Sequence, residues 1–164
     1  MTTLNWILLF VVAQRAVELL ISRRNTIKLL ADGGIEHGVE HYPVIVCLHA
    51  TWIGCLFLAD PIDPTGNLTL IAVFLALQIG RMWVIFSLGH RWTTRVITVP
   101  GLPLVRHGPY RWIKHPNYMI VMLEILILLL AFGAWELAII FSLLNAGILY
   151  HRIRIENPAL SNLK

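Results

Sequence analysis

Charged residues are scarce in this chain, and their scarcity excludes an ordinary soluble domain. Only 13% of the 164 residues are Asp, Glu, Lys or Arg, whereas 57% are hydrophobic, and the mean hydropathy is +0.72. Soluble domains carry about 25% charged and roughly 45–50% apolar residues. The composition therefore predicts an integral membrane protein, and the length predicts a single domain, residues 1–164.

Cysteine is also rare, which excludes a disulfide framework and a cysteine-based metal centre. Cys47 and Cys55 are eight positions apart in an apolar run and match no CxxC or zinc-ligand spacing. They are interpreted as buried free thiols. His37, His41 and His49 invite a metal interpretation, but they show no recognisable ligand pattern, so no metal site is predicted.

Several other signals are missing from the sequence. It contains no internal repeat and no low-complexity tract, and the first apolar run lacks the basic start and small-residue cleavage site of a signal peptide. No clear GxxxG motif indicates a dimer, so the oligomeric state is left open. The net charge of +4 is modest, and cations gather at the ends of apolar runs, which is a topology signal and does not indicate nucleic-acid binding.

Five apolar runs are predicted to cross the membrane as α-helices. They cover residues 4–21, 44–58, 68–88, 117–132 and 135–150. Because one crossing needs about 20 residues, the apolar stretch that ends at residue 150 is too long for a single helix. The Gly-Ala-Trp-Glu interruption within it predicts a helical hairpin. Residues 1–88 thus hold three spans, and 89–164 hold a polar segment followed by the hairpin.

The distribution of cations predicts the orientation of these spans. Segments 22–42, 89–116 and 151–164 carry clustered Lys and Arg and are predicted to be cytoplasmic. The acidic turn at 60–66 carries no cation and is expected outside, together with the N-terminus. Within the longest polar segment, residues 93–101 are rich in β-branched side chains and are interpreted as an extended or interfacial piece.

The first span carries polar residues in its second half. Gln14 and Arg15 lie four and three positions before Glu18, so all three share one side of a helix and can pair. Polar groups inside a span face the bundle or a cavity, and the alternative is a pair that reaches the interface. Gly33 and Gly34 are predicted to end any helix that continues from this span.

Segment 108–118, Gly-Pro-Tyr-Arg-Trp-Ile-Lys-His-Pro-Asn-Tyr, concentrates polar, aromatic and turn-forming residues between apolar helices. Such a segment is costly beside a membrane and is usually functional. The alternative is a basic aromatic anchor, which needs neither of the two turn motifs. Pro116 can occupy the first position of a helix, which leaves free N–H groups beside His115 and Asn117 for a carboxylate or phosphate.

Aromatic and acidic side chains extend this candidate site. Tyr110 and Tyr118 offer π faces and hydroxyls to an adenine or nicotinamide ring, and the turn at Gly108 lets the backbone approach a ligand. Glu156 can accept hydrogen bonds from a ribose or an amino group, unless it pairs with a neighbouring arginine. Glu124 is a carboxylate within a predicted span, which makes it a functional candidate; the alternative is a protonated Glu bonded to a neighbouring helix.

Three motifs occur together in the C-terminal half. They are Gly108-Pro109-Tyr110-Arg111, Lys114-His115-Pro116-Asn117-Tyr118 and, after the hairpin, Arg152-Ile153-Arg154-Ile155-Glu156. They resemble motifs of the isoprenylcysteine carboxyl methyltransferase family over roughly residues 80–160. The N-terminal half resembles a bacterial branch whose members O-methylate alkylpyrones or related phenolic lipids. The family's second closing glutamate is Asn157 here, which leaves the role of that position open.

The resemblance implies S-adenosylmethionine as cofactor, bound at the cytoplasmic surface of a bacterial-type inner (plasma) membrane. It also implies a lipophilic acceptor that enters from the bilayer. The implied cofactor-binding residues are His107, Gly108, Pro109, Tyr110, His115, Pro116, Tyr118 and Glu156. His115 is expected to act as base or to orient the acceptor, with Glu124 and Arg95 as secondary catalytic candidates.

The identity of the acceptor and two other functions stay open at this point. The acceptor oxygen belongs either to a carboxylate of a prenylcysteine-like group or to a hydroxyl of an alkylpyrone or phenolic lipid. An NADPH-dependent lipid or sterol-type reductase is the first alternative, because membrane sterol reductases share a similar hairpin with Gly-Pro-Tyr and His-Pro motifs. A non-catalytic membrane interaction protein is the second.

Overall fold

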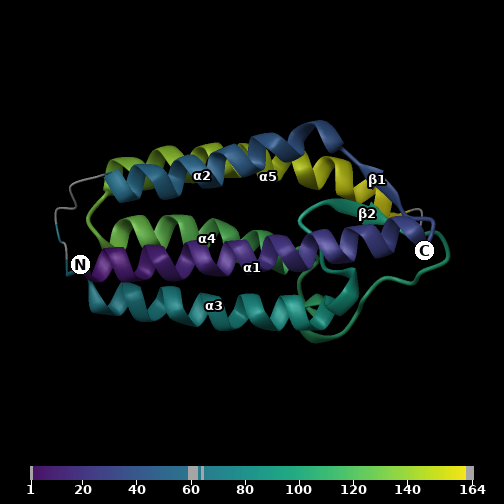
Figure 1. Cartoon of the computed structure of the whole chain (residues 1–164), viewed down its shortest axis with the longest axis horizontal. Helices are drawn as coiled ribbons and strands as arrows, with labels where there is room; N and C mark the ends of the chain where they lie inside the picture. Colours follow the sequence, from purple (N-terminus) through teal and green to yellow (C-terminus); the bar gives the residue numbers. More distant parts are fainter. Residues whose placement is uncertain (1, 59–62, 64, 162–164) are drawn as a thin grey trace.

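Five α-helices lie side by side along one axis of the molecule (Figure 1). The computed structural model describes residues 2–58, 63 and 65–161. The helices are α1 (Thr3–Ala31), α2 (Tyr42–Leu58), α3 (Leu68–Leu88), α4 (Pro116–Ala131) and α5 (Trp135–Ser161). The shorter elements are β1 (Ile35–His37), β2 (Val96–Thr98), η1 (Val39–His41), η2 (Gly89–Arg91) and η3 (Gly108–Arg111). A helical architecture with a closing α4–α5 hairpin was predicted, and it is confirmed.

Four of these helices are long and apolar enough to cross a membrane, namely α1, α2 together with η1, α3 and α5. Helix α4 has 16 residues, or about 24 Å at 1.5 Å per residue, which is shorter than a hydrocarbon core of about 30 Å. Large apolar side chains such as Ile79 and Phe86 are exposed on the outside of the bundle, as lipid contact requires. The chain is a membrane protein, while five crossings and an outside N-terminus stay predictions.

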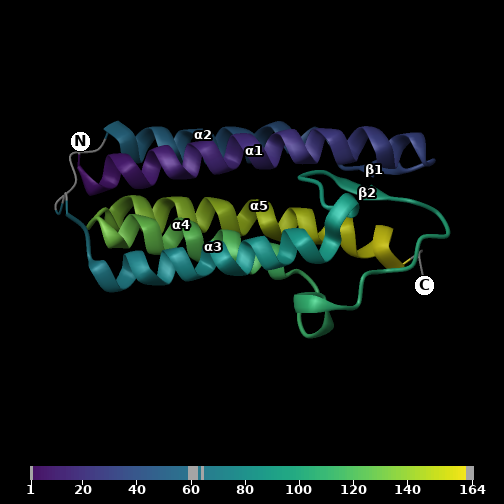
Figure 2. The same ribbon diagram turned by 60° about the horizontal axis from the view of Figure 1, so that its bottom comes forward.

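The polar segments gather at one end of the bundle. Figures 1 and 2 show both strands, the end of α1 and the end of α5 at the end opposite the N-terminus. Segments 22–42, 89–116 and 151–161 meet there, and we call this the polar end. The charge pattern predicted that these segments share one side. The predicted acidic turn at 60–66 falls largely on residues outside the described ranges.

Two helices extend well beyond the predicted spans. Helix α1 continues from residue 21 to Ala31 and stops just before Gly33, as the paired glycines predicted. Helix α5 continues from residue 150 to Ser161, so the prediction that Glu156 lies past the helix was wrong. The reason is that hydropathy marks the part of a helix in lipid, whereas backbone hydrogen bonds continue into the aqueous region.

A two-stranded antiparallel sheet joins two of the polar segments. β1 pairs with β2, with Ile35 opposite Thr98 and His37 opposite Val96. Asn25 of α1 adds a hydrogen bond from its Nδ2 to the carbonyl of Trp92, at 2.7 Å. The extended character of residues 93–101 was predicted, but the partner strand was not, because three residues are too few to show a strand period. The sheet fixes one wall of the pocket described below.

Both cysteines are free, but they are not buried as predicted. Cys47 is exposed and Cys55 is partly exposed on α2. The prediction failed because an apolar run inside a membrane helix does not separate the residues that face the core from those that face lipid.

Candidate functional site

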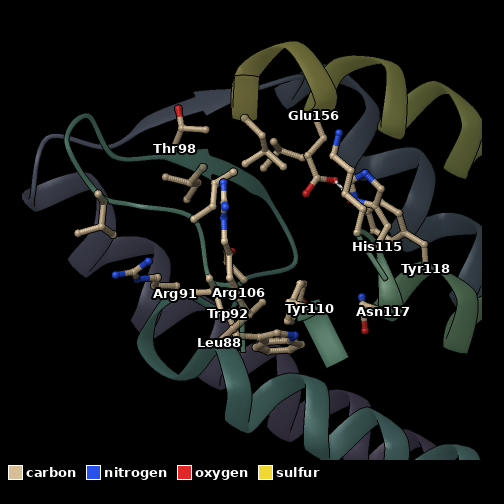
Figure 3. Close-up of a pocket in the computed structure, with 18 of the residues that line it drawn as sticks. Leu88, Arg91, Trp92, Thr98, Arg106, Tyr110, His115, Asn117, Tyr118 and Glu156 are labelled. Atoms are coloured by element: carbon tan, nitrogen blue, oxygen red, sulfur yellow. Dashed lines mark hydrogen bonds and ion pairs between the residues drawn. The ribbon is translucent and has the colours of Figure 1, made fainter. Parts of the chain in front are cut away.

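A pocket of about 420 Å³ opens at the polar end. Its volume lies in the range of small-molecule sites, roughly 300–1,000 Å³. Figure 3 shows side chains from α5, from the start of α4, from η3 and from the segment around β2 pointing into it. Its apolar lining includes Leu88, Trp92, Val96, Val99, Leu102 and Leu104. The pocket therefore combines an apolar wall with a group of polar side chains at the ends of α4 and α5.

A chain of hydrogen bonds orients Glu156 at this polar group. The hydroxyl of Tyr118 donates to Glu156 Oε2 and accepts from Arg152 Nε at 2.6 Å. Arg152 Nη2 donates to the carbonyl of Thr94 at 2.7 Å, which fixes the guanidinium against the β2 segment. Among the described residues, Glu156 makes no salt bridge to an arginine, so the alternative interpretation of this carboxylate was wrong.

His115 is held on both sides of its ring. Its Nε2 lies 3.1 Å from Asn157 Oδ1, its Nδ1 lies 3.6 Å from Glu156 Oε2, and its ring stacks on Tyr118 at 5.2 Å between centroids. Nε2 therefore lies within hydrogen-bond distance of the Asn157 side chain, and Nδ1 faces the Glu156 carboxylate. Asn157, the departure noted in the sequence, thus contacts one edge of the His115 ring.

The start of α4 presents an unsatisfied acceptor beside these residues. Pro116 occupies the first helical position, as predicted. Asn117 lines the pocket, and its Oδ1 is buried without a hydrogen-bond partner among the described residues. Because a buried acceptor without a partner is costly, this atom is suited to receive a ligand N–H or O–H group.

Tyr110 and Arg95 also belong to the polar lining. Burial and the nearby charge of Glu156 raise the pKa of Tyr110, so its hydroxyl stays protonated and available as a donor. Arg95 Nη1 lies 2.9 and 3.0 Å from the two carboxylate oxygens of Glu36, and its guanidinium lies over the ring of Tyr42. Arg95 therefore lines the pocket as predicted but is already paired with a β1 carboxylate.

Glu124, the third catalytic candidate, is not among the residues that line this pocket. It is fully buried, and its Oε2 accepts from Arg15 at 2.5 Å and from Arg81 at 3.1 Å. Arg81 also makes a bidentate pair with Glu18, at 2.6 and 2.7 Å, and Arg15 donates to Glu18 at 2.8 Å. We call Arg15, Glu18, Arg81 and Glu124 the buried ion cluster. It joins α1, α3 and α4, and only its Arg15–Glu18 pair was predicted.

Four of the eight predicted cofactor-binding residues line the pocket, namely Tyr110, His115, Tyr118 and Glu156. The other four, His107, Gly108, Pro109 and Pro116, shape the backbone around it. Gly108 has φ +59°, and a Cβ there would collide with the side chain of Ser87. Gly108 therefore lets η3 lie directly against α3. Sequence reasoning missed Arg152 as the residue that orients Tyr118; its place in the closing Arg-Ile motif was the available signal.

Substituting Gly108 with alanine is expected to displace η3 and weaken ligand binding at the pocket. The positive φ costs an L-residue about 1–2 kcal/mol, and the collision with Ser87 adds to it. Gly101→Ala is the matched control, because Gly101 also has positive φ (+78°) but its Cβ would meet open space. Thermal unfolding and ligand titration should show that Gly108→Ala loses more stability and more ligand affinity than Gly101→Ala. Equal losses in the two variants would contradict the role of the contact between Gly108 and Ser87.

The chain matches the isoprenylcysteine carboxyl methyltransferase family over residues 70–162. This region contains most of α3, all of α4 and α5, and the polar groups that converge at the pocket. The chain belongs to this family. Membership in the isoprenylcysteine carboxyl methyltransferase family indicates a membrane methyltransferase, and it places the hairpin and the pocket in the matched part of the chain.

Two relatives match over nearly their whole length. The first is the protein YpbQ of Bacillus subtilis (strain 168), described as uncharacterized, which is 41% identical over 160 residues, 94% of this chain and 95% of the relative. The second is an uncharacterized protein of Haemophilus influenzae (strain ATCC 51907 / DSM 11121 / KW20 / Rd), 26% identical over 159 residues, 93% of this chain and 92% of the relative. No solved structure matches the chain significantly.

Proposed function

We propose that this chain is an S-adenosylmethionine-dependent methyltransferase that O-methylates a lipophilic acceptor. The observation that carries the proposal is the convergence of Glu156, His115, Tyr118 and Asn117 on one pocket at the ends of α4 and α5. Membership in a methyltransferase family supports the reaction class. The pocket geometry supports a ligand that has both polar and apolar parts.

The residues of the pocket fit the chemical groups of S-adenosylmethionine. The Glu156 carboxylate suits the cofactor's ammonium or ribose hydroxyls. The unpartnered Oδ1 of Asn117 suits the amino group of adenine, beside the ring of Tyr110. Within the described residues, each of these cofactor groups therefore has a complementary partner.

S-adenosylmethionine supplies an already activated methyl group, so the protein has to align the acceptor oxygen and exclude water. We propose that Nε2–H of His115 donates to Asn157 Oδ1, which leaves Nδ1 to take the proton of a hydroxyl acceptor. A proton on Nδ1 then lies 3.6 Å from the Glu156 carboxylate. His115 is thus proposed as the general base, oriented by Asn157.

The acceptor is proposed to be a hydroxyl of an alkylpyrone-like or phenolic lipid in preference to a prenylcysteine-like carboxylate. The free Nδ1 of His115 favours the hydroxyl, because a carboxylate has no proton to remove at neutral pH. Arg95, one of three candidate partners for a carboxylate acceptor with Arg91 and Arg111, is already paired with Glu36. The apolar wall of the pocket supports an acceptor that arrives from the bilayer.

The pocket is proposed to face the cytoplasm of a bacterial-type inner (plasma) membrane. Arg23, Arg24 and Lys28 of α1 and several cations of segment 89–116 lie at the polar end, and clustered cations favour the cytoplasmic side. The supply of S-adenosylmethionine requires the same side.

The cofactor assignment is tested by calorimetric titration of the purified protein with S-adenosylmethionine and, separately, with NADPH. We expect binding of S-adenosylmethionine and no binding of NADPH. NADPH binding without S-adenosylmethionine binding would contradict the proposal and support the reductase alternative. Binding of neither, with and without added lipid, would favour a non-catalytic role.

Replacing His115 with alanine is expected to lower methyl transfer by about 10²- to 10⁴-fold, the usual contribution of a general base. Transfer is measured as radiolabelled methyl incorporated into lipid extracts. His90→Ala is the control, because His90 is an exposed histidine of η2 that does not line the pocket. Full transfer by well-expressed His115→Ala protein would show that the catalytic assignment is wrong.

A further inference from the structure

The segment around η3 carries an exposed aromatic and basic surface that the proposed reaction does not use. Arg106, Arg111 and Lys114 are exposed cations, and Trp112 and Ile113 are 69% and 38% exposed. We call these five residues the η3 surface. Within the described part of the chain, none of its three cations forms an ion pair. The surface therefore offers positive charge, without an acidic partner in the described residues, beside exposed apolar side chains.

The η3 surface lies beside the lipid-facing side of α3. Figure 2 shows η3 projecting sideways from the bundle, beyond α3, and not along the bundle axis. The ring of Trp112 packs against the ring of Trp83 of α3, with centroids 6.0 Å apart. Trp83 is half-exposed and Phe86, in the next turn, is 77% exposed. Since these α3 side chains face away from the bundle, η3 lies beside an exposed apolar face near the end of α3.

The composition of the η3 surface favours contact with a charged membrane interface. Tryptophan is suited to the head-group level of any bilayer, and it does not by itself distinguish one head group from another. Three cations without acidic partners add a preference for negative charge, because each juxtamembrane Lys or Arg is attracted to anionic lipid. We propose that the η3 surface binds the anionic head groups of phospholipids in the leaflet next to the polar end.

The same segment forms part of the pocket wall. Tyr110, Arg111, Trp112, Ile113 and Lys114 all line the pocket, so the proposed lipid-binding segment also borders the ligand space. Head-group binding is expected to hold this wall in place. The proposal does not depend on methyl transfer, because it concerns lipid contact and is measured without cofactor.

The test compares quenching of Trp112 fluorescence by brominated phosphatidylglycerol and brominated phosphatidylcholine in lipid nanodiscs. The contribution of Trp112 is the quenching measured for each protein minus the quenching measured for the same protein carrying Trp112→Phe. We expect a preference for phosphatidylglycerol of at least about fivefold, the contribution of one juxtamembrane cation. The preference should fall when salt rises from about 0.1 M to about 1 M, which shortens the screening length from about 10 Å to about 3 Å.

The triple variant Arg106→Gln/Arg111→Gln/Lys114→Gln is expected to lose the preference. The matched control, Arg23→Gln/Arg24→Gln/Lys28→Gln, removes three exposed cations from α1 at the same end of the bundle and is expected to keep it. Equal quenching by the two lipids in the wild type, or a preference unaffected by salt, would overturn the proposal even where the triple variant does not fold. A preference that survives the triple substitution, or that the control loses equally, would also overturn it.

Discussion

Replacing Glu156 with alanine is expected to raise the dissociation constant for S-adenosylmethionine by at least about 30-fold. Removing one partner of a buried, hydrogen-bonded charge pair costs about 2 kcal/mol or more, which corresponds to that factor. The substitution also removes the acceptor of the Tyr118 hydroxyl and the carboxylate beside His115. Calorimetric titration of purified wild-type and variant protein measures the change.

The control for this experiment is Glu136→Ala. Glu136 is an exposed glutamate in the first turn of the same helix, α5, at the opposite end of the bundle. Glu136→Ala should leave the affinity for S-adenosylmethionine unchanged. Glu156→Gln adds a second comparison: it keeps a hydrogen-bond acceptor but removes the charge, so it distinguishes a bond to ribose hydroxyls from a pair with an ammonium group. Unchanged binding in Glu156→Ala protein would exclude this carboxylate from the cofactor site.

Replacing Glu124 with alanine is expected to lower the free energy of unfolding by roughly 3–5 kcal/mol, the cost of removing one partner from a buried ion pair. Glu124 accepts from Arg15 and Arg81 inside the bundle, and the substitution leaves two buried guanidinium groups to share Glu18. Glu18→Ala should cost at least as much, because Glu18 accepts from Gln14 as well as from both arginines. Thermal unfolding in detergent measures both variants.

Ligand binding by Glu124→Ala protein distinguishes a structural role of Glu124 from a catalytic one. Because Glu124 does not line the pocket, folded Glu124→Ala protein at a permissive temperature should bind S-adenosylmethionine within about threefold of wild type, a difference of less than 1 kcal/mol. Glu136→Ala, an exposed change, should alter stability by no more than about 0.5 kcal/mol. Unaltered stability together with lost methyl transfer would show that Glu124 acts on the substrate.

The helical part of the fold could be predicted because lipid imposes strong rules on sequence. A helix that crosses a bilayer must satisfy its own backbone and expose apolar side chains, so apolar runs and their flanking cations are visible in one dimension. The predicted third span, residues 68–88, agrees with α3 at both ends. The predicted helix ends were wrong where helices continue past the apolar run, as in α5, which ends at Ser161. There the backbone hydrogen bonds of the helix continue although the hydropathy of the sequence has fallen.

The candidate site could be predicted only as a set of motifs. Tyr110, His115, Tyr118 and Glu156 could be identified as functional candidates from their sequence context, since polar and aromatic groups at turn positions beside membrane helices are otherwise costly. The sequence by itself could not rank Glu124 against them, because a carboxylate in an apolar run has the same one-dimensional appearance whether it faces a ligand or an arginine.

Which of these groups meet depends on how the helices pack. The antiparallel packing of α4 and α5 brings residue 118 to residue 156 and residue 115 to residue 157, while the packing of α1, α3 and α4 turns Glu124 toward Arg15 and Arg81. The physical reason is that a charge inside a membrane must find a partner. That partner can come from any helix, at a separation such as 43 residues for Arg81 and Glu124, which no local pattern in the sequence records.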